Sequence, residues 1–334
     1  MTTEEGVFSG GRGAETSRVR SWFRANGRNL LPFAVLLAEF IFFSVMKPQF
    51  LTEQNVYNIF RQSAVLLVVA LGATFIILMG SIDLSVGSVV TLSGIVASLL
   101  IRDAHMGVGA VLAAVVVGLV AGLINGVIFA KGKVPSFLVT LGTLSLFDGL
   151  ALLLIGGAPV MLSDRAFKWL TSGTLVGSLP NIGLWAILIF AVVVYVATRT
   201  RFGRYIYAIG GGERVSRLSG VNVDRYKIYA YMVSGLCAGI AGALMASRIG
   251  AGTPRMGEGL LLDSIAAVTV GGTALTGGVG GPARTLAGAL VIGILSTGLN
   301  VMSVDPFLQI MIKGAVVILA VLVTLDRSKI EIMK

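Results

Sequence analysis

The chain has 334 residues, of which 55% are hydrophobic and 13% are charged, and it carries a net charge of +10. Soluble domains are roughly 25% charged, so this composition excludes a soluble globular protein of this length. In so apolar a chain, the excess of basic residues indicates a charge bias between the two sides of a membrane. We do not interpret it as a surface that binds nucleic acid.

Apolar segments follow one another along the chain, and several run for 18 residues or more without a charge. A bilayer core about 30 Å thick requires roughly 20 apolar residues of helix. We therefore predict an all-α polytopic membrane protein with about ten transmembrane helices. They are expected at 30–46, 62–82, 86–101, 107–130, 135–156, 181–198, 228–247, 262–279, 285–304 and 306–325.

The distribution of Lys and Arg predicts the orientation, because cytoplasmic loops are enriched in these residues. With the N-terminus inside, 18 of the 26 basic residues fall on the cytoplasmic side. Both termini are then cytoplasmic, with tails at 1–29 and 326–334 around a membrane domain at 30–325. The largest cytoplasmic loop is 199–227.

Two glycine-rich interruptions stand out, "MGSIDLSVGS" (Met79–Ser88) and "VGGTALTGGVGG" (Val270–Gly281). Glycine-broken segments in the two halves of a membrane chain point to a transport pathway. In the first, Asp83 or Ser81 has a simpler explanation as an N-cap of the next helix. In the second, we favour a re-entrant or broken helix over ordinary close packing.

Three ionisable residues fall inside predicted spans: Glu39, Asp148 and Lys313. Such residues are costly in lipid and often functional, although these three are scattered and we favour structural or interfacial roles. A relay between Glu39 and Asp148 is what a gradient-driven transporter would require. Cys237 is the only cysteine, which excludes disulfides within the chain and sites built from several cysteines.

Sequence motifs for catalysis are missing. The chain has no GxxxxGK[ST] phosphate-binding loop, no HExxH pair and no GxSxG motif. We therefore expect no enzymatic activity, no metal site and no cofactor in this chain.

A basic segment interrupts the apolar chain at 201–227. It contains six Lys and Arg residues against Glu213 and Asp224. Tyrosines flank the segment, as expected at a membrane–water boundary; they are Tyr205, Tyr207, Tyr226, Tyr229 and Tyr231. Composition alone leaves two readings open, a solvated positive-inside loop or a surface for another protein.

Five blocks in order carry a family resemblance. They are "GSIDLSVGSVVTLSG" (80–94), "GLINGVIFAKGKVPSFLVTLGTLSL" (122–146), "YAIGGGERVSRLSGVNVDRYKIYAYMVSGLCAGIAGAL" (207–244), "DSIAAVTVGGTALTGGVGG" (263–281) and "FLQIMIKGAVVILAVLVTLD" (307–326). The chain resembles the permease subunits of bacterial ATP-binding-cassette (ABC) importers of the ribose/galactose/xylose type. It departs from the usual family pattern at Asp148, Gly212 and Thr297.

The resemblance implies a multi-pass protein of the bacterial inner membrane that imports a monosaccharide or related polyol. The implied partners are a tandem ABC ATPase that holds ATP and Mg, a periplasmic sugar-binding protein and a second permease copy, all within membrane lipid. The implied ATPase-coupling residues are Gly210, Glu213, Arg214, Arg217, Ser219, Gly220 and Val221. For the translocation path we expect Asp83, Ser85, Thr273, Thr276 and Asn300. The alternative function is gradient-driven secondary transport of a small polar solute.

Overall fold

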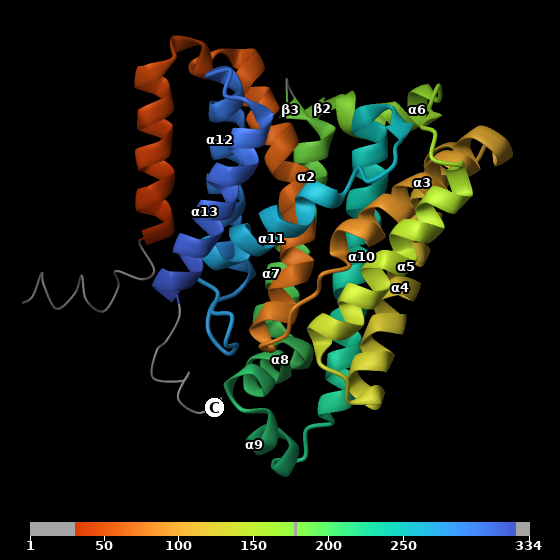
Figure 1. Cartoon of the computed structure of the whole chain (residues 1–334), viewed down its shortest axis with the longest axis vertical. Helices are drawn as coiled ribbons and strands as arrows, with labels where there is room; N and C mark the ends of the chain where they lie inside the picture. The colour runs from red at the N-terminus through yellow and green to blue at the C-terminus, as the bar shows by residue number, and fades with distance from the viewer. Residues whose placement is uncertain (1–30, 177–178, 325–334) are drawn as a thin grey trace, which may run out of the picture.

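The computed structural model describes residues 31–176 and 179–324, and these residues form a bundle of helices (Figure 1). The two tails predicted at 1–29 and 326–334 lie outside the described residues.

The elements are labelled in chain order after an apolar helix at Leu31–Met46. The helices are η1 (Pro48–Leu51), α2 (Glu53–Leu78), α3 (Val86–Ala104), η2 (Gly107–Gly109), α4 (Ala110–Gly132), α5 (Ser136–Ile155), α6 (Arg165–Ser172), α7 (Asn181–Arg199), α8 (Arg201–Gly211), α9 (Glu213–Leu218), α10 (Val223–Ile249), α11 (Glu258–Val270), α12 (Pro282–Val301) and α13 (Pro306–Thr324). The strands are β1 (Val160–Met161), β2 (Thr174–Val176), β3 (Leu179–Pro180) and β4 (Ala251–Gly252). They pair antiparallel as β1–β4 and β2–β3.

Within the described ranges, seven helical segments are long and apolar enough to cross a membrane: α2, α3, η2 with α4, α5, α7, α10 and α12. The helix Leu31–Met46 and the apolar part of α13, Pro306–Leu322, are slightly shorter. The helix α11 has only 13 residues. The structure thus has the all-α architecture of a polytopic membrane protein, and each predicted apolar segment contains a helix.

Helix α2 forms the centre of the bundle. In its most apolar stretch 89% of the residues are buried, against 72% in α3 and α12 and 61% in α10. In α4, α5 and α7 the buried share is 28%. Because these three helices are apolar yet exposed, they provide the surface expected to face lipid.

Helices α4 and α10 approach closely through glycines. A Cβ added at Gly118 would overlap the carbonyl oxygen of Gly235, and one added at Gly239 would lie 2.5 Å from the carbonyl oxygen of Ala114. Small residues at such contacts allow van der Waals packing between helix backbones in lipid, where water supplies no hydrophobic driving force. The close contact between α4 and α10 is one place where the many glycines of the chain have a structural role.

Two predicted segments have wrong boundaries. Helix α2 begins at Glu53, nine residues before the predicted start, because its first turns tolerate charged residues. It ends at Leu78, since Gly80 adopts φ +72°, a left-handed conformation that stops the helix. The segment predicted at 262–279 is helical only up to Val270, and an irregular loop at 271–281 follows.

The predicted segment at 262–279 is interrupted where its glycine-rich stretch begins, and only α11 remains helical. Thirteen residues of α-helix extend about 20 Å, which is less than the bilayer core. In Figure 1 it lies across the longer helices at mid-height. Its carboxyl end therefore lies within the protein, where the loop 271–281 begins.

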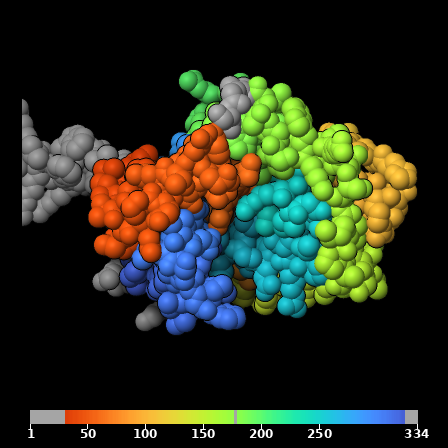
Figure 2. Space-filling view, turned by 90° about the horizontal axis from the view of Figure 1, so that it is seen from above, coloured from red at the N-terminus to blue at the C-terminus, as the bar shows by residue number. Residues whose placement is uncertain are grey.

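The two ends of the bundle differ. Helices α8 and α9 lie together at one end, and α6 with the β2–β3 pair lies at the other (Figure 1). The helix Leu31–Met46 begins, and α13 ends, towards the α8–α9 end. Viewed from above in Figure 2, the first helix and α12 occupy one flank and the end of α3 the opposite flank.

Candidate functional site

The basic segment forms two short helices between α7 and α10. Helix α8 begins after Thr200, whose Oγ1 accepts a hydrogen bond from the amide of Gly203 at 3.3 Å. Helix α9 ends at Leu218, and Gly220, two residues later, has φ +84° and donates its amide to the carbonyl of Arg217 at 3.1 Å. The residues Ser219–Val221 therefore serve to terminate α9 and turn the chain into α10.

Ion pairs hold α9 against the start of α10. Glu213 contacts Arg217 at 3.3 Å and Lys227 at 2.9 Å, and Arg217 also contacts Asp224 at 2.8 Å. Arg217 is one of the implied ATPase-coupling residues, and in the structure its guanidinium pairs with carboxylates of the same chain. Arg214 is exposed and has no ion pair among the described residues.

Two of the side chains that α9 exposes to solvent are apolar. The exposed fraction is 68% for Val215 and 81% for Leu218, whereas Ser216 between them is buried. Exposed apolar side chains at the tip of a protein mark a surface for another protein. The sequence analysis missed these two residues, although a six-residue helix with one apolar edge was readable in "GERVSRL".

A junction of three segments lies directly behind α8. The amide of Gly278 donates to the carbonyl of Leu78, the last residue of α2, at 2.9 Å. Gly210 lies against both: an added Cβ would overlap the Leu78 oxygen and lie 2.5 Å from the Gly278 nitrogen. Gly210 thus belongs to this junction, and the exposed surface of α9 lies beyond it. Gly210 was predicted as a residue of the coupling loop, and its contact with Leu78 and Gly278 was not predicted.

Tyr207 makes the second link between α8 and the glycine-rich loop. Its hydroxyl donates to the carbonyl of Gly280 at 2.9 Å. Burial raises the pKa of Tyr207, with a smaller opposing effect of Arg284, so the hydroxyl is protonated and able to donate at neutral pH. Helix α8 therefore contacts both the end of α2 and the 271–281 loop.

The break between α2 and α3 is a network of polar side chains. Asp83 accepts from the amide of Ser85 at 2.9 Å, from its hydroxyl at 2.7 Å and from the hydroxyl of Ser234 at 3.3 Å. Asn125 donates to the Ser85 hydroxyl at 2.8 Å, and Tyr231 donates to the carbonyl of Ile82 at 3.2 Å. Non-helical backbone at membrane depth requires such partners.

These contacts give Asp83 a structural role at the helix break. It holds the turn that leads into α3, close to the predicted capping role, although α3 has no side-chain cap of its own. The cavity beside it has a volume of about 60 Å³, which holds about two water molecules. Asp83 and Ser85 therefore stabilise the helix break in this conformation.

The other three predicted path residues fall in two places, the glycine-rich loop and the end of α12. Thr273 is buried and accepts the amide of Gly281 at 3.1 Å, so it closes the glycine-rich loop. The carbonyl of Thr276 lies where a Cβ on Gly80 would meet it, at 3.3 Å. Asn300 is exposed at the far end of α12 and accepts from Gln309 at 3.0 Å. The structure groups Thr273 and Thr276 and separates Asn300 from them.

Lys313 has an ion-pair partner, which fits the structural role expected for it. Its Nζ lies 2.9 Å from Asp263 Oδ2, which links α13 to the short helix α11. Side-chain exposure is 23% for Lys313 and 16% for Asp263. Asp263 is the sixth residue of α11 and falls within the segment predicted at 262–279, but it was not counted among the ionisable residues of the predicted spans.

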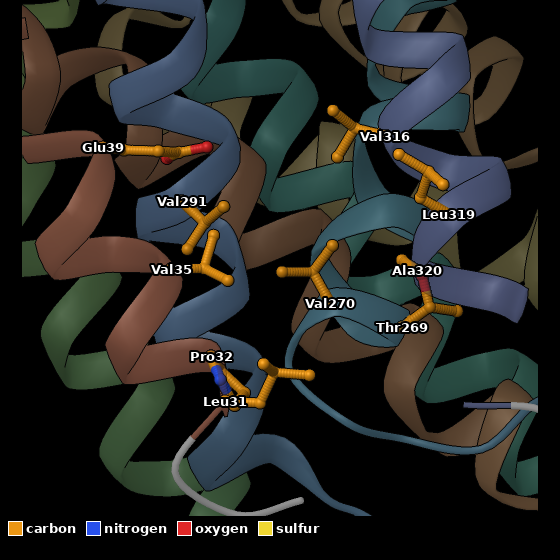
Figure 3. A pocket seen from close by; sticks show the side chains of 10 residues that line it. All are labelled: Leu31, Pro32, Val35, Glu39, Thr269, Val270, Val291, Val316, Leu319 and Ala320. Atoms are coloured by element: carbon orange, nitrogen blue, oxygen red, sulfur yellow. The ribbon is translucent and has the colours of Figure 1, made fainter. Parts of the chain in front are cut away.

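Glu39 and Asp148 do not form a relay. Glu39 lies on the helix Leu31–Met46 at one flank of the bundle, and Asp148 lies on α5 on the other side of the central helices (Figure 1). Glu39 borders a largely apolar cavity of about 300 Å³ between the first helix, α11, α12 and α13 (Figure 3). One of its carboxylate oxygens is buried there without a hydrogen-bond partner among the described residues.

The fold and the junction together indicate a class of membrane protein. Apolar exposed helices surround broken helices whose ends meet at a buried junction, and an exposed two-helix element is fixed to that junction. This is the architecture of a multi-pass membrane transport protein.

Comparison with known proteins identifies the family. The family described as the permease component of the branched-chain amino acid transport system matches residues 55–321. The ribose import permease protein of Bacillus subtilis (strain 168) is 39% identical over 317 residues, 94% of this chain and 98% of the relative. The L-arabinose ABC transporter permease protein of Azospirillum brasilense is 35% identical over 290 residues, 86% of this chain and 85% of the relative.

A third relative, the D-allose transport system permease protein of Escherichia coli (strain K12), is 33% identical over 295 residues, 88% of this chain and 89% of the relative. The chain therefore belongs to this family of ABC transporter permeases and is a multi-pass membrane protein. The resemblance drawn from the five sequence blocks is confirmed.

Proposed function

We propose that the chain is the permease subunit of an ABC importer that moves a monosaccharide or related polyol across the bacterial inner membrane. A separate tandem ATPase, which holds ATP and Mg, docks on α9. A periplasmic sugar-binding protein delivers the sugar at the opposite end, and a second permease copy completes the pathway. Three relatives named for ribose, L-arabinose and D-allose support the substrate class.

One observation carries this proposal. Val215 and Leu218 are exposed on α9, and α8 beside them is fixed to the end of α2 and to the glycine-rich loop. A partner that binds α9 and changes shape on ATP hydrolysis would move this junction. The ends of the broken helices would then shift between two arrangements, which alternates access to the pathway.

The test compares two exposed leucines on opposite ends of the protein. Leu218→Asp places a charge on the proposed docking surface, and Leu175→Asp does the same on β2, where Leu175 is 60% exposed. Burying a leucine at an interface contributes roughly 2 kcal/mol, so its loss weakens ATPase binding about 30-fold. Each variant is purified from native membranes in mild detergent, and the co-purifying proteins are identified by mass spectrometry.

We expect a tandem ATPase with wild type and with Leu175→Asp, and its loss with Leu218→Asp. An ATPase retained at equal yield by all three proteins would move the docking surface away from α9. If wild type brings down no ATPase even after chemical crosslinking, the importer proposal is wrong and gradient-driven transport becomes the better explanation.

A further inference from the structure

Three ionisable side chains lie on one face of the molecule without partners. They are Asp148 on α5, Arg255 in the turn before α11 and Glu258 at the start of α11. Helices α5 and α11 both pack against α3, and the charges of Arg255 and Glu258 act on Asp148. Among the residues that the structure describes, none of the three makes a side-chain hydrogen bond or an ion pair. We call these three residues the charged window.

The backbone of the window is fixed against α3. The amide of Gly257 donates to the hydroxyl of Thr91 at 3.0 Å, and a Cβ added at Gly87 would lie 2.7 Å from the Gly257 carbonyl oxygen. Arg255 accepts the amide of Glu258 at 3.0 Å and has φ +55°. A residue other than glycine in the left-handed region is uncommon, and here the surrounding contacts hold it there.

The window also lies within the depth of the bundle. Asp148 is on α5, between Ser136 and Ile155, and α11 crosses the bundle at mid-height (Figure 1). Both α5 and α11 pack against α3. Arg255 and Glu258 are exposed and Asp148 is half-exposed. Unpaired charges facing lipid at this depth are costly, and in membrane proteins they face water-filled cavities or partners instead. This face is therefore not a lipid-facing surface.

We infer that the charged window lines the aqueous path of the transporter and contacts the hydroxyl groups of the sugar. The inference rests on the proposed function and assigns residues to it that differ from those expected from the sequence. Each sugar hydroxyl both donates and accepts hydrogen bonds. The guanidinium of Arg255 offers donors only, and the carboxylates of Asp148 and Glu258 offer acceptors only, so the three together match the two roles of a hydroxyl.

The first test asks whether the window faces water. Asp148→Cys and Glu258→Cys are compared with Leu153→Cys, a position on α5 that is 79% exposed on another side of the helix. The native Cys237 is buried and gives a low background. In membrane vesicles, the charged thiol reagent MTSES is expected to label the two window cysteines at least tenfold faster than Cys at 153. Equal, slow labelling of all three by MTSES, with fast labelling by membrane-permeant N-ethylmaleimide, would overturn the inference.

The second test measures uptake of radiolabelled ribose, L-arabinose and D-allose by the assembled transporter in cells. Arg255→Gln, Asp148→Asn and Glu258→Gln are each expected to lower uptake at least tenfold and to change the ratio among the three sugars. Arg255→Lys, which keeps a cationic donor, is expected to recover part of the activity. Arg102→Gln is the control, because Arg102 pairs with Asp103 on the surface at the far end of α3.

The two tests separate the inference from the proposed function. Window variants that retain wild-type uptake and sugar preference overturn the inference even when the cysteines are labelled. A loss of uptake accompanied by loss of the co-purifying ATPase would indicate misfolding or misassembly, which also contradicts a role confined to sugar contact. If wild type takes up none of the three sugars, the proposed substrate class fails, and cysteine labelling alone then decides whether the window lines water.

Discussion

Gly210 offers the sharpest test of the junction behind α8. In Gly210→Ala, the new methyl group would overlap the Leu78 carbonyl and crowd the Gly278 amide, both of which are backbone atoms. Overpacking of this kind costs about 1–3 kcal/mol. Separating the two segments also weakens the 2.9 Å hydrogen bond between them, worth about 0.5–1.5 kcal/mol. The junction should therefore lose about 1.5–4.5 kcal/mol.

The neighbouring Gly211 is a matched control within the same helix. No atom lies within 4 Å of a Cβ added there, and alanine in a helix is favoured over glycine by roughly 0.5–1 kcal/mol. We expect Gly211→Ala to be neutral or stabilising. The two variants therefore make the same chemical change and differ only in what the methyl group meets.

The assay for this pair combines thermal unfolding in detergent, ATPase co-purification and sugar uptake. Gly210→Ala should unfold at lower temperature than Gly211→Ala and lose uptake at least tenfold, while the ATPase still co-purifies because Val215 and Leu218 are unchanged. Equal stability and uptake in the two variants would refute the junction. Loss of the ATPase from Gly210→Ala would instead make Gly210 part of the docking surface.

Three further predictions follow from single contacts. Lys313→Met leaves the Asp263 carboxylate unpaired and should destabilise the protein by about 1–3 kcal/mol. This is less than the roughly 3–5 kcal/mol of a fully buried pair, because both side chains retain some exposure. Denaturation of the double variant with Asp263→Leu should show recovered stability, and no recovery would refute the pairing. Tyr207→Phe removes the hydrogen bond to the glycine-rich loop and should cost about 1 kcal/mol with reduced uptake; unchanged uptake would show that this link does not transmit movement. Gly118→Ala should separate α4 from α10, whereas Gly142→Ala, which meets no atom within 4 Å, should leave thermal unfolding unchanged; equal unfolding temperatures would contradict the packing described here.

The positions of the helices followed largely from local sequence, but their ends did not. Apolar runs place a helix in every predicted segment because hydrophobicity and length are local properties. The start of α2 at Glu53 was missed because charged residues were taken as loop. The end of α11 at Val270 depends on the glycine-rich turn that follows it, and the sequence indicated a break there without its position.

The candidate site was harder to predict, since its contacts join residues far apart in the chain. The basic segment was identified from charge and glycine spacing, yet Arg217 is bound to Glu213 and Asp224 within the chain. The partners of Tyr207 and Lys313 lie 73 and 50 residues away. No local pattern encodes such pairings, because they arise only when the helices pack.

By itself, the sequence determined that this protein is a helical membrane protein, that two glycine-rich segments interrupt it and that it belongs with sugar-type ABC permeases. Those properties rest on composition and on ordered local motifs, which survive without knowledge of packing. Only the tertiary structure decided that Gly210 meets the end of α2, that Asp83 holds a helix break and that Asp148, Arg255 and Glu258 share one face. The reason is physical: close backbone approach and the neighbourhood of charges are properties of packed helices, and a linear pattern does not specify which faces meet.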